Sequence, residues 1–125
     1  MQLTLTPQVL AARKLTCSTH EARLVLRDLK SKVSEDISPM EKSLILEAIS
    51  EISFRLNELE NAKESITEAI GLIEKHNLSR SQYVSQLLLL SEILTAENRG
   101  VEAKAISIFA KELAKSSFVQ VPEKF

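Results

Sequence analysis

The sequence predicts an all-α domain of six helices. Leu, Ile, Ala, Glu, Lys and Ser dominate the 125 residues, aromatic residues make up only 4%, and this composition favours helix over strand. Two glycines and three prolines leave little material for the tight turns of a β-sheet. Apolar residues recur at the helical spacing of three and four along most of the chain. The expected helices cover residues 7–16, 19–34, 39–56, 59–76, 80–97 and 101–116.

Four of the six helix starts carry a recognisable signal. Thr6 is a capping residue, and Pro7 suits the first helical position because the N–H that it lacks would have no partner there. Three serines are followed three residues later by a Glu or a Gln, which is the spacing of a capping box: Ser18 with Glu21, Ser38 with Glu41, and Ser79 with Gln82.

The breaks between helices are short, which favours antiparallel hairpins. We expect a single domain over residues 1–116 that consists of hairpins at 1–36, 39–76 and 80–116, followed by a C-terminal tail at 117–125. An ordinary six-helix bundle is the alternative arrangement of the same helices.

Parts of the second hairpin recur 41 residues later in the third. A serine lies midway along each first helix, an asparagine lies at each turn, and two alanines seven residues apart lie along each second helix. The aligned residues are Leu46 with Leu87, Ser50-Glu51-Ile52 with Ser91-Glu92-Ile93, Asn57 with Asn98, Ala62-Lys63 with Ala103-Lys104, and Ala69 with Ala110. Small residues at these places let paired helices approach closely.

This order of residues resembles the tetratricopeptide repeat, whose helix pairs carry a large and then a small residue on the first helix and two alanines on the second. The matching residues are Leu46, Ile49, Ser50, Ala62 and Ala69, and then Leu87, Leu90, Ser91, Ala103 and Ala110. The repeat is about seven residues longer than the usual ~34, and it lacks the usual aromatic residues and closing proline. The first hairpin carries only Ala22 and would be a degenerate repeat. The resemblance implies a right-handed superhelix of helix pairs.

In that family, one face of the first helices lines a concave groove that holds a peptide or a partner helix. Carried over by position, this face consists of Leu44, Glu47, Glu51, Phe54, Ser85, Leu88, Glu92 and Thr95. Such a groove is partly apolar and partly acidic, which suits a basic or amphipathic segment of another protein. The resemblance therefore implies a non-enzymatic adaptor, chaperone or immunity-type inhibitor, although ordinary solvated glutamates would give the same pattern.

The last expected helix spreads apolar residues over a broad arc, whereas a terminal repeat needs a polar outer face. Either the tail, which contains Phe118 and Phe125, folds back as a lid, or another chain covers the surface. The candidate residues for self-association as a homodimer are Ile106, Phe109, Leu113 and Phe118.

Two charged stripes have the spacing of helix faces: His20, Arg23, Arg27 and Lys30, and then Glu60, Glu64 and Glu68. If the hairpins stack as repeats do, the second and fourth helices become neighbours and the two stripes could face each other; the alternative is that the basic stripe is a patch that binds phosphates or acids. Residues 1–33 hold six Lys and Arg against two acids, so a nucleic-acid-associated regulator is the alternative function. The net charge of −1 and the lack of interleaved aromatic residues do not favour it.

The sequence predicts no catalytic residues, no metal site and no cofactor. Cys17 and His20 lie three residues apart with no further Cys or His nearby to complete a zinc site. His76 has the position of a helix C-terminal residue that pairs with the dipole. The glycines, Gly71 and Gly100, cannot form a phosphate-binding loop.

The expected location is the cytoplasm, without a membrane association. Cys17 is the single cysteine, so the chain forms no internal disulfide, as is usual in a reducing compartment. The first residues lack the pattern of a signal peptide. The longest uninterrupted apolar run, Leu87–Leu90, is far shorter than the roughly 20 residues that a membrane-spanning helix needs.

Overall fold

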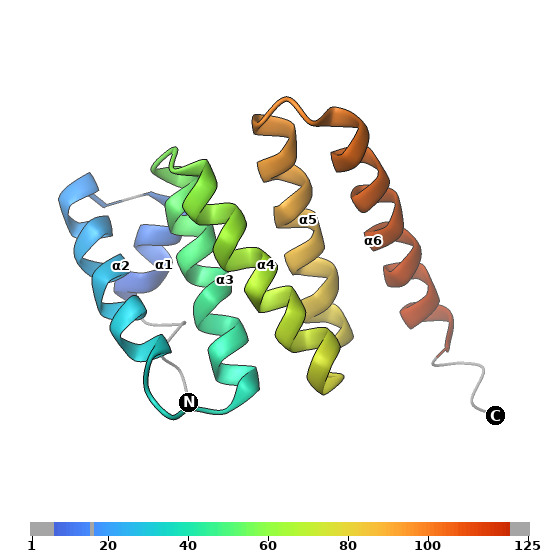
Figure 1. The fold of residues 1–125 in the computed structure, drawn as a ribbon, viewed down its shortest axis with the longest axis horizontal. Helices are drawn as coiled ribbons and strands as arrows, with labels where there is room; N and C mark the ends of the chain where they lie inside the picture. The colour runs from blue at the N-terminus through green and yellow to red at the C-terminus, as the bar shows by residue number, and fades with distance from the viewer. Residues whose placement is uncertain (1–6, 16, 121–125) are drawn as a thin grey trace.

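The structure is a computed structural model that describes residues 7–15 and 17–120, with the side chains described as far as Lys115. It is all-α, and no strand occurs in the described residues (Figure 1). The helices are α1 (Pro7–Lys14), α2 (Thr19–Val33), α3 (Pro39–Arg55), α4 (Leu59–His76), α5 (Arg80–Ala96) and α6 (Gly100–Gln120). All six expected helices are present, and α6 continues to Gln120, beyond its expected end at 116. The expected cap at Thr6 lies outside the described residues.

The serine caps form as expected, but only one of them is a complete capping box. The amide of Glu21 donates to Ser18 Oγ at 3.1 Å, and the Glu21 carboxylate accepts from the Ser18 amide at 3.1 Å. Ser38 Oγ and Ser79 Oγ accept from the amides of Glu41 and Gln82, but neither of these side chains accepts from the amide of its serine. At the start of α5 this is because the Gln82 side chain instead donates to the carboxylate of Glu47 on α3.

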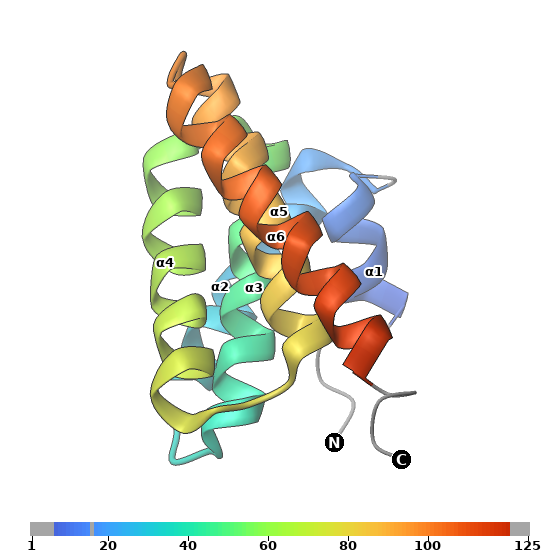
Figure 2. The same ribbon diagram turned by 90° about the vertical axis from the view of Figure 1, so that its right-hand side faces the viewer.

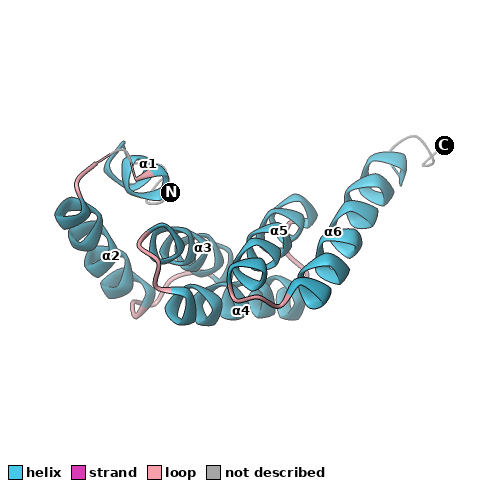
Figure 3. Cartoon of the chain, turned by 90° about the horizontal axis from the view of Figure 1, so that it is seen from above, coloured by secondary structure: helices cyan, strands magenta, loops and turns pink. Residues whose placement is uncertain are grey.

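The helices form three antiparallel hairpins, α1/α2, α3/α4 and α5/α6, which are stacked in chain order (Figure 1). The first helix of each later hairpin contacts both helices of the hairpin before it. Viewed along the stack, α1 and α4 lie on opposite sides (Figure 2). Viewed from above, the stack curves, with α1, α3 and α5 along the inner side and α2 and α4 along the outer side (Figure 3). The three first helices therefore form the concave surface.

Helix α3 is the centre of the core because it contacts α1, α2, α4 and α5. Buried residues accordingly occur on every side of it, and Ile45 and Ile52 are almost completely inaccessible. The neighbouring helices contribute Leu29, Ile66 and Ile93 to the same core.

The 41-residue recurrence has a direct structural counterpart. In the second hairpin, Ser50 Oγ donates to the carbonyl oxygen of Ala62 at 2.7 Å. In the third hairpin, Ser91 Oγ donates to the carbonyl oxygen of Ala103 at 2.8 Å. The small residues thus let the two helices approach, and the serine forms the same interhelical hydrogen bond in each pair.

The turns within these two hairpins are also equivalent. Asn57 and Asn98 both adopt the left-handed conformation, with φ angles of 63° and 64°. In each turn the amide of the following residue donates to the carbonyl five residues earlier, at 2.8 Å and 2.9 Å. This is the Schellman arrangement that ends a helix, and asparagine tolerates its left-handed residue better than most side chains do. Asn77, with φ of 51°, ends α4 in the same way.

Candidate functional site

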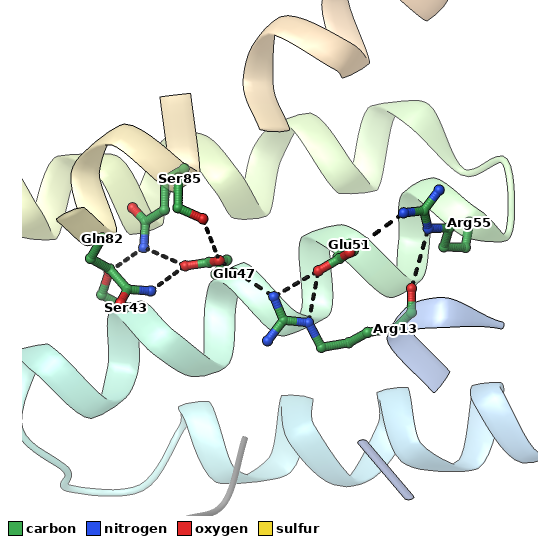
Figure 4. A network of polar contacts seen from close by, with 8 residues as sticks. Arg13, Ser43, Glu47, Glu51, Arg55, Gln82 and Ser85 are labelled. Carbon is green, nitrogen blue, oxygen red and sulfur yellow. Dashed lines mark hydrogen bonds and ion pairs between the residues drawn. The ribbon is translucent and has the colours of Figure 1, made fainter. Parts of the chain in front are cut away.

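A buried carboxylate lies at the centre of the concave surface. Glu47, midway along α3, is only 6% exposed and accepts four hydrogen bonds from side chains of α1 and α5 (Figure 4). Arg13 Nη2 lies 3.4 Å from it, Ser85 Oγ 3.2 Å and Gln86 Nε2 3.2 Å, and Gln82 Nε2 also donates to it. A carboxylate can be buried at this place because its charge is paired and its oxygens have donors.

The second carboxylate of the cluster, Glu51, lies one turn further along α3 and is held between two guanidinium groups. Arg13 Nε donates to Glu51 Oε1 at 2.7 Å, and Arg55 Nη2 lies 3.6 Å from Glu51 Oε2. Arg55 Nε also donates to the carbonyl oxygen of Arg13 at 3.2 Å, which fixes the end of α1. The charges of Glu47 and Glu51 are therefore balanced within the chain by Arg13 and Arg55 (Figure 4).

Gln86 extends the cluster into the core. It is inaccessible to solvent, and its Nε2 donates to Ser43 Oγ at 2.9 Å as well as to Glu47. Ser43 Oγ in turn donates to the carbonyl oxygen of Ala69 on α4 at 3.1 Å. The polar network thus joins α1, α3, α4 and α5. Within the described part of the chain, Gln86 Oε1 and Ser53 Oγ are buried without a hydrogen-bond partner.

A pocket of about 500 Å³ lies against this network on the concave side. Its lining comes from α1, α3 and α5: Arg13, Glu47, Glu51, Arg55, Ser81, Val84, Ser85, Leu88, Leu89 and Glu92. Leu88 is 37% exposed, and Glu92, one turn further along α5, is exposed. No ion pair involves Glu92 among residues 7–15 and 17–115. The pocket therefore offers an exposed apolar side chain, Leu88, and an acid without an ion pair among the described residues, Glu92, on the same helix.

The structure brings together five of the eight residues expected for the groove: Glu47, Glu51, Ser85, Leu88 and Glu92. Leu44 and Phe54 are half-buried and do not line the pocket, and Phe54 packs against the core. Thr95 is exposed and donates its hydroxyl to the carbonyl of Ser91 in its own helix at 2.9 Å. Glu47 is buried in the network, so it does not present a free carboxylate to solvent.

Sequence reasoning did not identify Arg13, Gln82 or Gln86 as members of this site. A usable signal exists for Gln86, because a glutamine within the apolar stretch of α5 needs a buried polar partner. Arg13 and Gln82 carry no such signal in the sequence. They join the site only because α1 and α5 both pack against α3 in the folded chain.

The two charged stripes do not face each other, contrary to one expectation. Helix α2 contacts α3 and not α4, so Arg27 and Lys30 remain exposed. Arg23 instead donates to Glu58, before the start of α4, at 2.6 Å, and this hydrogen bond holds the pKa of the Glu58 carboxyl below its usual value. Among the described residues no ion pair joins α2 to Glu60, Glu64 or Glu68.

Cys17 and His20 of the first hairpin belong to no cluster suited to metal chemistry among the described residues. His20 is exposed, and Cys17 is half-buried beside Leu24 and Val25 in a pocket between α1 and α2. No group of three His, Cys, Asp or Glu side chains that could hold a metal ion occurs in the part of the chain that the structure describes. Likewise, none of the helices, over their described residues, has the length and apolar character needed to cross a membrane.

The residues expected for self-association lie in different environments on α6. Ile106 and Leu113 are half-buried and pack against the core, whereas Phe109 is 49% exposed. The side chain of Phe118 lies outside the described residues. Residues 117–120 continue α6, and residues 121–125 of the expected lid also lie outside the described part.

The contact between α5 and α6 allows a direct spectroscopic test. Tyr83 packs edge-on against Phe109, with ring centroids 6.3 Å apart, and its hydroxyl donates to Glu74 at 2.7 Å. Burial, and then this carboxylate, raise the pKa of Tyr83 to about 12. The chain has one tyrosine and no tryptophan, so the change in near-ultraviolet absorbance on ionisation of a phenol comes from this residue alone.

We expect the phenolate to appear with a midpoint near pH 12, and Glu74→Gln to lower that midpoint only partly because burial is the larger cause. The pKa of Tyr83 is higher in the folded protein than in the unfolded chain, so the neutral phenol contributes to the free energy of unfolding. This contribution is complete below about pH 10 and is lost as the pH rises toward 12. A midpoint near 10, in protein still folded by circular dichroism, would contradict this environment for Tyr83.

Comparisons of the chain with protein-family models, with curated proteins and with solved structures each gave no match.

Proposed function

We propose that the chain is a non-enzymatic protein-interaction module whose concave groove binds a segment of another protein. The observation that carries this proposal is the pocket between α1, α3 and α5, where exposed Leu88 and unpaired Glu92 lie one turn apart. A concave site that combines apolar side chains with a few converging polar groups is typical of binding sites.

The charged side chains in the groove indicate which charge the partner segment carries. Three carboxylates, those of Glu47, Glu51 and Glu92, lie among two guanidinium groups. Glu47 and Glu51 form ion pairs, whereas Glu92 forms none with the residues that the structure describes. A matching segment carries an apolar side chain for Leu88 and one basic side chain for Glu92, one helical turn away. We therefore infer an amphipathic segment with a single critical Lys or Arg rather than a strongly basic one.

The fold is consistent with this role. Repeated helix pairs that expose a concave surface are suited to holding a peptide or a helix, and the Ser50–Ala62 and Ser91–Ala103 bonds support the resemblance to tetratricopeptide repeats. An adaptor, a chaperone or an immunity-type inhibitor in the cytoplasm would use the groove in this way.

The test is affinity capture by the tagged protein from lysate of its own cells at moderate salt, with mass spectrometry of the retained species. Leu88→Glu and Glu92→Lys change the groove, and Glu47 is left intact because its carboxylate holds the fold together. The matched controls are Leu24→Glu, at a leucine on α2 that is 43% exposed, and Glu35→Lys, at an exposed acid that follows α2.

One stoichiometric partner that both groove variants lose and both controls keep would support the proposal. Equal binding by the groove variants and by the unchanged protein would contradict it. Retained nucleic acid that is released steeply by salt and lost in an Arg27→Ala/Lys30→Ala variant would replace it with the alternative of a nucleic-acid-associated regulator.

A further inference from the structure

The outer face of α6 differs from the equivalent face of α4. The repeat offset of 41 residues places the outward positions of α4 on those of α6: Glu60 on Val101, Glu64 on Ala105, Thr67 on Ile108, and Glu68 on Phe109. Polar residues on α4 are thus replaced by apolar residues on α6. Val101 is 87% exposed, Ile108 52% and Phe109 49%. We call Val101, Ala105, Ile108 and Phe109 the apolar ridge.

The apolar ridge is not the surface on which a fourth hairpin would stack. In α4 the equivalents of the ridge residues remain exposed although α5 packs on this helix, whereas Ile66, Ile70 and Ile73 are buried. The equivalents of these isoleucines on α6 are Ser107, Lys111 and Ala114, so the buried isoleucines of α4 are not repeated on α6. Stacking of a further hairpin therefore does not explain the apolar ridge.

A groove of about 680 Å³ lies beside the ridge, between α4 and α6. Leu90 and Leu94 of α5 form its apolar floor, Glu64 and Glu68 lie on the α4 side, and Ile106 lies on the α6 side. The two walls are separate, because α4 and α6 make no contact. The outer surface thus has a hollow and a ridge next to each other.

Charged side chains border this surface on both sides. On α4, Glu60 and Glu64 are exposed and form no ion pair among the described residues, and Glu68 lies 3.9 Å from Lys42. On α6, three exposed lysines at spacings of seven and four follow the flank of the ridge that faces away from α4: Lys104, Lys111 and Lys115. Only Lys115 has a described ion-pair contact, with Glu112 at 3.9 Å. We call the three glutamates Glu60, Glu64 and Glu68 the acidic stripe and the three lysines Lys104, Lys111 and Lys115 the lysine stripe. Across the face the order is therefore the acidic stripe, the groove, the apolar ridge and the lysine stripe.

We propose that this outer face binds a second copy of the chain in a two-fold symmetric dimer. The two-fold axis lies between the two contacting faces and runs parallel to α6. Rotation about it reverses the order of the four features in the second copy. The acidic stripe of each copy then faces the lysine stripe of the other, and each ridge enters the groove of the other. A surface that is complementary to itself in both shape and charge closes as a dimer and leaves no exposed apolar ridge. The concave groove remains free, so this inference does not depend on the proposed function.

The first test is the mass of the unchanged protein by sedimentation equilibrium over a concentration series that reaches the millimolar range. We expect a dimer, and we expect Ile108→Glu to raise the dissociation constant at least tenfold, because a charge replaces a central apolar contact. Leu24→Glu is the matched control and leaves the dimer intact, and circular dichroism checks that each variant is folded. A monomer throughout the series, or equal effects of the two variants, would overturn the proposal.

The second test exchanges the charged stripes. Glu60→Lys/Glu64→Lys makes both stripes basic, and Lys104→Glu/Lys111→Glu makes both stripes acidic, so each variant alone is expected to be monomeric. An equimolar mixture is expected to restore dimers that contain one chain of each kind. Failure of the mixture to associate, while the unchanged protein dimerises, would overturn this geometry. Capture of a different protein that Ile108→Glu loses, by a chain that is itself monomeric, would overturn the assignment to a second copy.

Discussion

Replacement of Glu47 by leucine is expected to lower the free energy of unfolding by about 3 kcal/mol. The change removes the acceptor of four side-chain hydrogen bonds while their donors stay in place. The Gln86 amide is then buried with Ser43 Oγ as its one remaining acceptor, and Arg13 keeps only Glu51 as a charged partner. Urea unfolding followed by circular dichroism measures the loss.

The matched control is Glu92→Leu, which removes an exposed acid without an ion pair among the described residues and is expected to change stability by at most about 0.5 kcal/mol. Glu47→Gln keeps the shape and one acceptor oxygen, so its effect should lie between the two. If Glu47→Leu is no more destabilising than Glu92→Leu, the buried network does not stabilise the fold.

Replacement of Ala62 by leucine should also destabilise the fold by about 3 kcal/mol, at the upper end of the usual effect of overpacking. Ala62 is completely buried where α4 packs on α3, and its carbonyl accepts the Ser50 hydrogen bond at 2.7 Å. Helix α4 also contacts α5, so an outward shift that makes room for the larger side chain would disturb this second contact as well.

The equivalent change in the last hairpin provides a comparison within the same chain. Ala103→Leu is expected to cost about 1 kcal/mol, because α5 is the one helix against which the described part of α6 packs closely, so a shift of α6 disturbs fewer contacts. Ala96→Leu, at an exposed position on α5, serves as the control for the added side chain. The same urea titration gives all three values, and an order with Ala103→Leu as the largest loss would contradict this description of the packing.

The parts of the fold that the sequence predicts well depend on local chemistry. The starts of α2, α3 and α5 follow from serines that accept the amide three residues later, a contact within a single turn. The equivalent left-handed turns at Asn57 and Asn98 are local in the same sense, because each turn forms within about six residues. Such features need no knowledge of the neighbouring helices.

The parts that the sequence did not predict depend on which helices become neighbours. Gln82 has the spacing of a capping residue, yet its side chain crosses to Glu47, which is 35 residues away in the chain. One expectation placed the charged stripes of α2 and α4 opposite each other, but α2 packs on α1 and α3 and not on α4. A pattern along one helix shows which residues share a face, but it does not show which helix covers that face.

The polar network around Glu47 also has a consequence for how the chain unfolds. Stacked helical repeats are usually quasi-one-dimensional, and a terminal hairpin can separate while the others remain folded. Here the first helices of all three hairpins supply donors or acceptors to one buried carboxylate cluster. Detachment of the first or the last hairpin would therefore take away donors that keep Glu47 paired. The network couples the hairpins, and we expect the protein to unfold as one cooperative unit rather than repeat by repeat.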